Sequence, residues 1–340
     1  MGEAHCQGKG VHTSPYLSSN LTHMADVLSI YLLTHNRPHQ AIEAIRSILA
    51  QSDRRFKLIV SDNSDNNELS ALLGSLMPSL EYIYRNDDGA CLPAFEHFNL
   101  CISEVKTQYF SLLHDDDLVM PNYVGQFWRA QQLFPNAIAF GCNAKIRHLS
   151  GLEQPSFVSS RQYCGPIAAQ NLAWRYFGKH QLGIAPFPFY VYNKHAIGNI
   201  HFSGQFGKYG DVAWLLDLAN KGDMVWINSA MGVYQHHQGN DSNLESRRDR
   251  LRFLAYLKQN KLPEHSLLLT LYRRFLYKKI LSSNEILIGS KRSEVLGRFM
   301  TAPLYRMRIF LFNLNPLFFK CKVKIELFIM KALGRSHAIR

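Results

Sequence analysis

The sequence predicts an α/β fold in which a mostly parallel sheet is flanked by helices, followed by a basic, mainly helical C-terminal region. Short apolar runs of strand length alternate with segments whose apolar residues recur at helical spacing. Hydrophobic residues make up 46% and charged residues 19% of the 340-residue chain, a globular balance that excludes wholesale disorder. Positive charge gathers at the C-terminal end, where residues 265–340 hold 15 Lys and Arg against 3 acidic residues.

The strands and helices of the body can be assigned in chain order from these patterns. Each expected strand is a short, mainly apolar run, and each expected helix has apolar residues three or four positions apart. The expected strands are residues 27–33, 56–60, 81–84 and 109–113. The expected helices are a segment that begins at Pro38 and the segments 68–76 and 92–105. This alternation is typical of a parallel sheet that is covered on both faces.

We expect three parts along the chain. Residues 1–25 are polar and lack periodicity, which predicts a flexible leader, and they lack the features of a signal peptide. Residues 26–245 are expected to form the α/β domain, with halves at 26–120 and 121–245. The remaining residues, 246–340, are expected to form the basic helical region.

Each expected strand is followed by a polar or acidic cluster, at residues 34–37, 62–65, 85–89 and 114–117. Because ligands of such sheets lie beyond the carboxyl ends of the strands, the clusters are expected to line one rim. The chain has neither the glycine-rich dinucleotide fingerprint nor a P-loop. A nucleotide bound at this rim would therefore need a metal ion to hold its diphosphate.

Three consecutive carboxylates, Asp115, Asp116 and Asp117, follow the strand at 109–113, and the local sequence supplies no cation to offset their repulsion. Carboxylate oxygens suit Mg²⁺ or Mn²⁺, which commonly complete their shells with phosphate oxygens of a substrate. An isolated acidic triplet is more often a solvated turn or a helix cap, here before Pro121. Its position at a strand end beside other acidic strand ends favours the metal site.

Three motifs carry a resemblance to a known family. They read I-Y-L-L-T-H-N-R-P at residues 30–38, S-D-N-S at 61–64 and L-H-D-D-D at 113–117. They are similar to the strand followed by T-Y-N-R, the D-D-G-S and the metal-binding L-D-x-D-D of glycosyltransferase family 2. In this order and spacing, residues from about 27 to 242 resemble that family. The resemblance implies a GT-A nucleotide-sugar-binding fold.

The resemblance implies that residues 26–120 bind the nucleotide of a nucleotide-sugar donor. Asp62 would accept a hydrogen bond from the imide N–H of uracil or thymine, because an ionised carboxylate only accepts. The residues expected at the nucleotide are Thr34, Asn36, Arg37, Asp62, Asn86, Gly89 and Asp115.

The resemblance also implies a metal site for Mn²⁺ or Mg²⁺. Asp116 falls on the usual metal-binding position and is the first choice, and Asp117 is a supporting ligand. The stretch V-Y-Q-H-H-Q-G-N-D-S at 233–242 is similar to the family's y-R-x-H-x-x-N-x-S and places His237 on the motif histidine, near the metal or diphosphate. Where the family often has an Asp, this chain has His114, so the ribose contact stays open between His114 and Asp115.

Residues 121–245 would supply the acceptor side. An apolar-periodic helix is expected at 209–219 with Asp211 at its start. Taken alone, Asp211 could equally be an ordinary helix cap. In the family an E-D pair opens this helix and its Asp is the catalytic base, which makes Asp211 the expected base although Gly210 replaces the Glu. Asp217, on a later turn, is expected to be solvated or structural.

These residues lead us to expect an inverting glycosyltransferase that uses a UDP- or dTDP-sugar. The acceptor would be a hydroxyl of a polysaccharide or a lipid-linked glycan, as in bacterial-type surface glycan synthesis. The alternative is a non-catalytic nucleotide-sugar or carbohydrate-binding protein that keeps the fold. The presence of Asp62, Asp116 and Asp211 together favours the enzyme, because a binding protein has no use for a base.

Within the basic C-terminal region, residues 265–340 carry a formal charge of +12, equal to that of the whole chain, with cations interleaved among aromatic and aliphatic residues. This pattern favours an anionic membrane surface as partner, with a packed helical subdomain as the alternative. No nucleic acid is expected, since no reader motif is present. Without a membrane-spanning run, and with 6 scattered cysteines that suit reduced thiols, we expect a cytoplasmic protein, peripheral at the inner face of the membrane.

Overall fold

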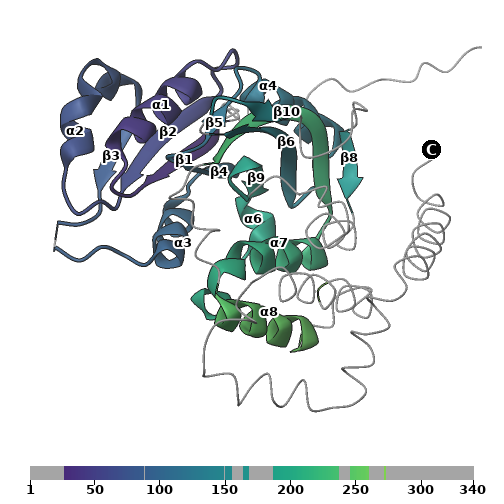
Figure 1. Cartoon of the computed structure of the whole chain (residues 1–340). Coiled ribbons are helices and arrows are strands. Elements are labelled where there is room, and N and C mark those ends of the chain that lie inside the picture. Colours follow the sequence, from purple (N-terminus) through teal and green to yellow (C-terminus); the bar gives the residue numbers. More distant parts are fainter. Residues whose placement is uncertain are drawn as a thin grey trace, which may run out of the picture. The chain divides into compact units, whose positions relative to one another are not determined.

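The structure is a computed structural model, in which residues 27–87, 89–148, 150–154, 164–167, 187–236, 246–259 and 272 can be described (Figure 1). The chain divides into two compact units, Met1–Leu276 and Tyr277–Arg340, and all described residues belong to the first. The expected leader at 1–25 and most of the expected basic region lie outside the described residues. Among the helices that can be described, none has the length and apolar character to cross a bilayer.

The first half of the sheet is parallel, as the sequence predicts. Strand β1 (Leu28–Thr34) lies between β2 (Phe56–Asp62) and β4 (Tyr109–His114), and β3 (Glu81–Tyr84) extends the sheet beyond β2. All residues of β1 are buried, so both faces of the sheet are covered here. The register pairs Thr34 with Asp62 and Leu33 with His114, which brings the ends of three strands to one rim.

Helices connect these strands at the expected places. Helix α1 (Pro38–Leu49) has a proline in its first turn and turns its apolar side into the core, and α3 (Ala94–Glu104) precedes β4. The helix expected at 68–76 is shorter. Helix α2 (Glu68–Leu73) ends where Gly74 adopts a positive φ of 42°, and the 3₁₀ turn η1 (Gly74–Ser79) follows. A glycine in this conformation commonly ends an α-helix.

The second half of the sheet is mixed. Strand β9 (Tyr190–Asn193) runs antiparallel between β4 and β6 (Ala139–His148), and β6 pairs in parallel with β10 (Met224–His236). At the edge, β5 (Leu118–Val119) pairs with β10, and two short strands pair off this path, β7 (Glu153–Gln154) with β6 and β8 (Cys164–Ile167) with β10. Helix α4 (Tyr123–Leu133) follows β5 along the chain.

The remaining helical segments lie in the second half of the described chain. They are η2 (Phe187–Phe189), α6 (Lys194–Ile197), η3 (Gly204–Tyr209), α7 (Gly210–Lys221) and α8 (Arg247–Gln259). Helix α7 matches the helix expected at 209–219. Tyr256 of α8 donates its hydroxyl to Asp217 Oδ1 of α7 at 2.6 Å, and its ring packs on Phe206. The first helix of the region 246–340 therefore packs on the body, and Asp217 has a structural partner.

Candidate active site

Three buried aspartates form the centre of the candidate site. The chain leaves β4 at His114 and turns through Asp115, Asp116 and Asp117, which are 4%, 7% and 4% exposed. Burying several carboxylates is costly unless a cation or hydrogen-bond donors compensate. Arg37 supplies part of that compensation from the loop after β1, since its Nη1 donates to Asp115 Oδ1 at 3.0 Å and to Asp116 Oδ2 at 2.8 Å. The local sequence around the triplet gives no sign of this partner.

The electrostatics of the cluster differ from residue to residue. Burial raises the pKa of Asp115 to about 6, although the charge of Arg37 opposes the shift, and the backbone N–H of His35 donates to Asp115 Oδ2. The pKa of Asp117 is raised well above its usual range, first by burial and then by the neighbouring Asp116. The cluster therefore still lacks positive charge with Arg37 in place.

A metal ion fits these residues. Ligand atoms of His114, Asp116 and Asp117 all lie within 4.8 Å of one another. Asp117 Oδ1 accepts from the backbone N–H of Gln235, whereas Oδ2 is buried with no hydrogen-bond partner in the part of the chain that the structure describes. An orphaned buried carboxylate oxygen beside a second carboxylate and an imidazole is a suitable donor set for Mn²⁺, and also for Mg²⁺ through its oxygens. The expected ligand His237 lies outside the described residues.

The loops after β1 and β2 are tied together beside this cluster. Asn36 has a positive φ of 56°, and its backbone N–H donates to Ser64 Oγ at 2.8 Å. Its side chain donates to Asp65 Oδ2 at 2.6 Å and accepts from the Asp65 backbone N–H. Thr34 is buried at the end of β1. The structure thus brings Thr34, Asn36 and Arg37 to the rim that holds the aspartates.

Asp62 lies at the end of β2 but is enclosed. Its side chain is 0% exposed, Oδ1 accepts from the Ser64 backbone N–H at 3.0 Å, and Oδ2 accepts from the Tyr82 hydroxyl at 2.8 Å. Asn86 is also buried and donates to the Ser64 carbonyl, while Gly89 lies in the next turn with a φ of 75°. The nucleobase of a donor can contact Asp62 only if the side chains around Asp62 rearrange. The partner Tyr82 was not expected from the sequence.

Asp211 lies on a different element, in the first turn of α7. Its Oδ1 accepts from the Val212 backbone N–H at 2.8 Å, and burial raises its pKa to about 6. Such a carboxyl is ionised at neutral pH but holds a proton more readily than an exposed one.

Helix α3 contacts both the acidic cluster and the start of α7. Phe98 stacks against the His114 ring with centroids 5.7 Å apart. One turn earlier, Phe95 covers Gly210, where an added Cβ would lie 2.5 Å from the Phe95 ring. The ring therefore takes the space that a side chain at 210 needs, which explains the glycine before Asp211. Nothing in the sequence pairs Phe95 with Gly210.

Comparison with known sequences identifies similarity to glycosyltransferases. The family model described as glycosyl transferase family 2 matches residues 29–179. An uncharacterised glycosyltransferase of Rickettsia prowazekii is 31% identical over 98 residues, which cover 29% of this chain and 30% of that protein. Glycosyltransferase GlyG of Streptococcus pneumoniae is 20% identical over 225 residues, 64% of this chain and 73% of that one. This chain thus spans less than a third of the length of the first of these relatives.

Comparison with solved structures supports the fold. S. aureus TarS 1–349 has a TM-score of 0.58 at 12% identity, covering 78% of this chain and 76% of that one. Its complex with UDP-GlcNAc has a TM-score of 0.60 at 11% identity, covering 78% and 77%. Sequence identities this low show a similarity of fold only. With the motifs at the ends of β1, β2 and β4, the family match identifies residues 29–179 as a glycosyltransferase family 2 domain, and the fold is of the GT-A type.

Proposed function

We propose that the chain is an inverting glycosyltransferase that moves a sugar from a UDP- or dTDP-sugar to a hydroxyl of a polysaccharide or lipid-linked acceptor. The observation that carries the proposal is the buried cluster at the sheet rim, where three aspartates meet Arg37 and one carboxylate oxygen has no hydrogen-bond partner among the described residues. A divalent cation and the diphosphate of a donor would satisfy this arrangement together.

In this proposal Asp116 and Asp117 hold Mn²⁺ or Mg²⁺, and the neighbouring His114 is a further ligand. His237 is the additional ligand expected from the sequence. When bound, the cation neutralises the charge that develops on the departing diphosphate. Arg37 orients the carboxylates and adds a second positive charge at the same place. Asp115 holds the ribose side of the donor, and Asn86 and Gly89 belong to the loop that covers it.

Asp211 is the proposed general base. Its pKa of about 6 leaves it ionised at neutral pH and able to take the proton of the acceptor hydroxyl. In a single displacement the acceptor oxygen attacks the anomeric carbon as the bond to the diphosphate breaks, and the configuration inverts. No second carboxylate is assigned as a nucleophile.

The choice of a uracil or thymine nucleotide rests on Asp62 and on the relatives. Asp62 offers only acceptor atoms to a base edge, which matches an imide N–H. The neighbouring TarS structures hold UDP-GlcNAc and UDP, which supports a uridine donor here. Because Asp62 is enclosed, donor binding is expected to displace the side chains around it.

The domain division and the location are also proposed. Residues 26–245 would form the catalytic domain, and the charged residues beyond α8 would hold it at the anionic inner face of a membrane, in the cytoplasm.

Release of nucleoside diphosphate tests the proposal. Purified protein is offered UDP-, dTDP- and GDP-sugars with Mn²⁺ or Mg²⁺ and candidate acceptors. We expect metal-dependent release from a UDP- or dTDP-sugar, lost in Asp116→Asn and kept in Asp223→Asn, the same change at an exposed aspartate. Donor binding without any turnover across the panel would instead indicate a non-catalytic binding protein.

A further inference from the structure

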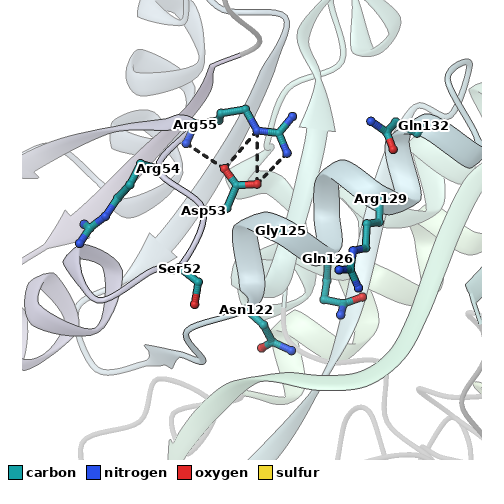
Figure 2. Close-up of a pocket in the computed structure, with 9 residues that line it drawn as sticks. All are labelled: Ser52, Asp53, Arg54, Arg55, Asn122, Gly125, Gln126, Arg129 and Gln132. Carbon is teal, nitrogen blue, oxygen red and sulfur yellow. Dashed lines mark hydrogen bonds and ion pairs between the residues drawn. The ribbon is translucent and has the colours of Figure 1, made fainter.

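A polar groove lies outside the acidic cluster. It has a volume of about 650 Å³ and is lined by the loop before β2 and by α4 (Figure 2). Because that loop precedes β2, the groove lies at the amino end of the strand, whereas Asp62 lies at its carboxyl end. Ser52 fixes the loop against the chain that leads into α4, since its backbone N–H donates to the Pro121 carbonyl at 2.8 Å.

The groove is strongly cationic. Arg54, Arg55 and Arg129 line it together with a single acid, Asp53. Arg55 neutralises that acid, with Nε 3.1 Å from Asp53 Oδ1 and Nη2 2.6 Å from Oδ2, and this contact lowers the pKa of Asp53. Neither Arg54 nor Arg129 forms an ion pair with any of the described residues. Two positive charges of the groove are therefore not neutralised within the described part of the chain.

The groove is also held in shape without a ligand. Arg54 donates to the Leu49 carbonyl at 2.6 Å, and the Arg55 guanidinium lies 5.0 Å above the Trp128 ring. Figure 2 shows Arg129 on α4 across from the Asp53–Arg55 pair, whereas the Arg54 side chain is directed away from α4. Ordering these side chains before binding reduces the entropy that a ligand must offset.

The other polar groups of the groove suit an oxyanion. Arg129 shares one exposed side of α4 with Gln126 and Asn122, whose amides can donate hydrogen bonds. Asn122 stands at the amino end of this helix without a side-chain cap, where the helix dipole adds positive potential. Arginine with amide donors is a suitable set for a phosphate group.

We propose that this groove binds a phosphate group, centred on Arg129. The phosphate belongs either to a soluble phosphorylated compound or to the headgroup of an anionic lipid, since both present the same oxygens. The inference is independent of the proposed transfer reaction, because none of these residues belongs to the candidate active site.

Three variants of the full chain test the proposal. Arg129→Gln removes the central charge, and Gly125→Leu fills the groove without changing charge, since a Cβ at 125 meets Asp53 Cβ at an ordinary 3.6 Å. Arg248→Gln makes the same charge change at an exposed position on α8 and serves as the control. Binding of inorganic phosphate and glucose 1-phosphate is measured by titration at constant ionic strength with chloride as the reference anion. Binding to vesicles of phosphatidylglycerol and of phosphatidylcholine is measured by sedimentation.

We expect about tenfold weaker binding in Arg129→Gln, the effect of one lost charge-assisted hydrogen bond, and a comparable loss in Gly125→Leu. Arg248→Gln should bind like the unchanged protein. A loss confined to the soluble phosphates identifies a soluble ligand, and a loss of binding to phosphatidylglycerol vesicles identifies a lipid headgroup. Equal binding by all three variants in both assays overturns the proposal, because the attraction would then come from charge elsewhere on the chain.

Discussion

Arg37 is expected to act as the internal cation of the acidic cluster when no metal is bound. Its replacement by Met keeps an apolar chain in place of the aliphatic part of the side chain but removes the guanidinium and both of its contacts, to Asp115 at 3.0 Å and to Asp116 at 2.8 Å. Breaking a fully buried pair by removing one partner costs about 3–5 kcal/mol. Because the Arg37 side chain is 30% exposed, solvent screening reduces the expected loss to about 2 kcal/mol.

Thermal unfolding at pH 7.5 in EDTA measures this loss. A loss of about 2 kcal/mol lowers the melting temperature by roughly 4–8 °C in a domain of this size. Arg147→Met is the matched control, since Arg147 pairs with Glu153 at the surface and such a pair contributes about 0–1 kcal/mol. Added Mn²⁺ should then stabilise Arg37→Met more than the unchanged protein, because the ion no longer competes with the guanidinium for Asp116.

Two results would refute this reasoning about Arg37. One is an Arg37→Met protein that loses no more stability than Arg147→Met. The other is an equal rise in melting temperature with Mn²⁺ in both proteins, which would mean that the ion and the guanidinium do not share the carboxylates.

Four further predictions concern Asp211, Gly210 and Tyr82. Asp211→Asn should lower turnover by about 10²–10⁴-fold while donor affinity is kept, and activity of the unchanged protein should fall as the pH drops through about 6; a pH profile without that limb contradicts the assignment. Because of the same raised pKa, Asp211 in the folded protein keeps a proton that it has already lost in the unfolded chain. The free energy of unfolding that Asp211 contributes, measured with urea, should therefore decrease as the pH rises from about 4 to 6. Gly210→Ala should destabilise the protein by about 1–3 kcal/mol through contact with the Phe95 ring, and Phe95→Leu in the same chain should recover most of the loss. Tyr82→Phe removes one hydrogen bond to Asp62 and should change UDP affinity severalfold by calorimetry, whereas an unchanged affinity would separate Asp62 from base recognition.

Local patterns predicted the first half of the fold well. Strands β1, β2, β3 and β4 and helix α1 begin within a residue of their expected positions, because each strand is a short, mainly apolar run between polar loops. The helix at 68–76 was expected to be longer, and the positive φ of Gly74 ends it early.

The second half was not predictable in the same way. Strand β9 enters the sheet from a distant part of the chain and runs antiparallel between β4 and β6, and periodicity carries no information about such pairing. Only tertiary structure supplies these neighbours.

The candidate site was also predictable only in part. The expected parallel sheet predicted that the residues after β1, β2 and β4 share a rim, and the register of the strands brings their ends together. The ion pairs from Arg37 to Asp115 and Asp116 span 78 and 79 positions, so no local pattern indicates them. The same holds for the contact between Phe95 and Gly210. The role of each residue in catalysis stays a prediction.

Calorimetric titration of the full chain with UDP tests the central claim most directly. The claim is that the aspartate cluster holds a divalent cation that in turn holds the donor diphosphate. UDP should bind in Mn²⁺, bind much more weakly in EDTA, and lose its metal dependence in Asp116→Asn while the Asp223→Asn control behaves like the unchanged protein. UDP binding of equal strength in Mn²⁺, in EDTA and in Asp116→Asn would contradict the account.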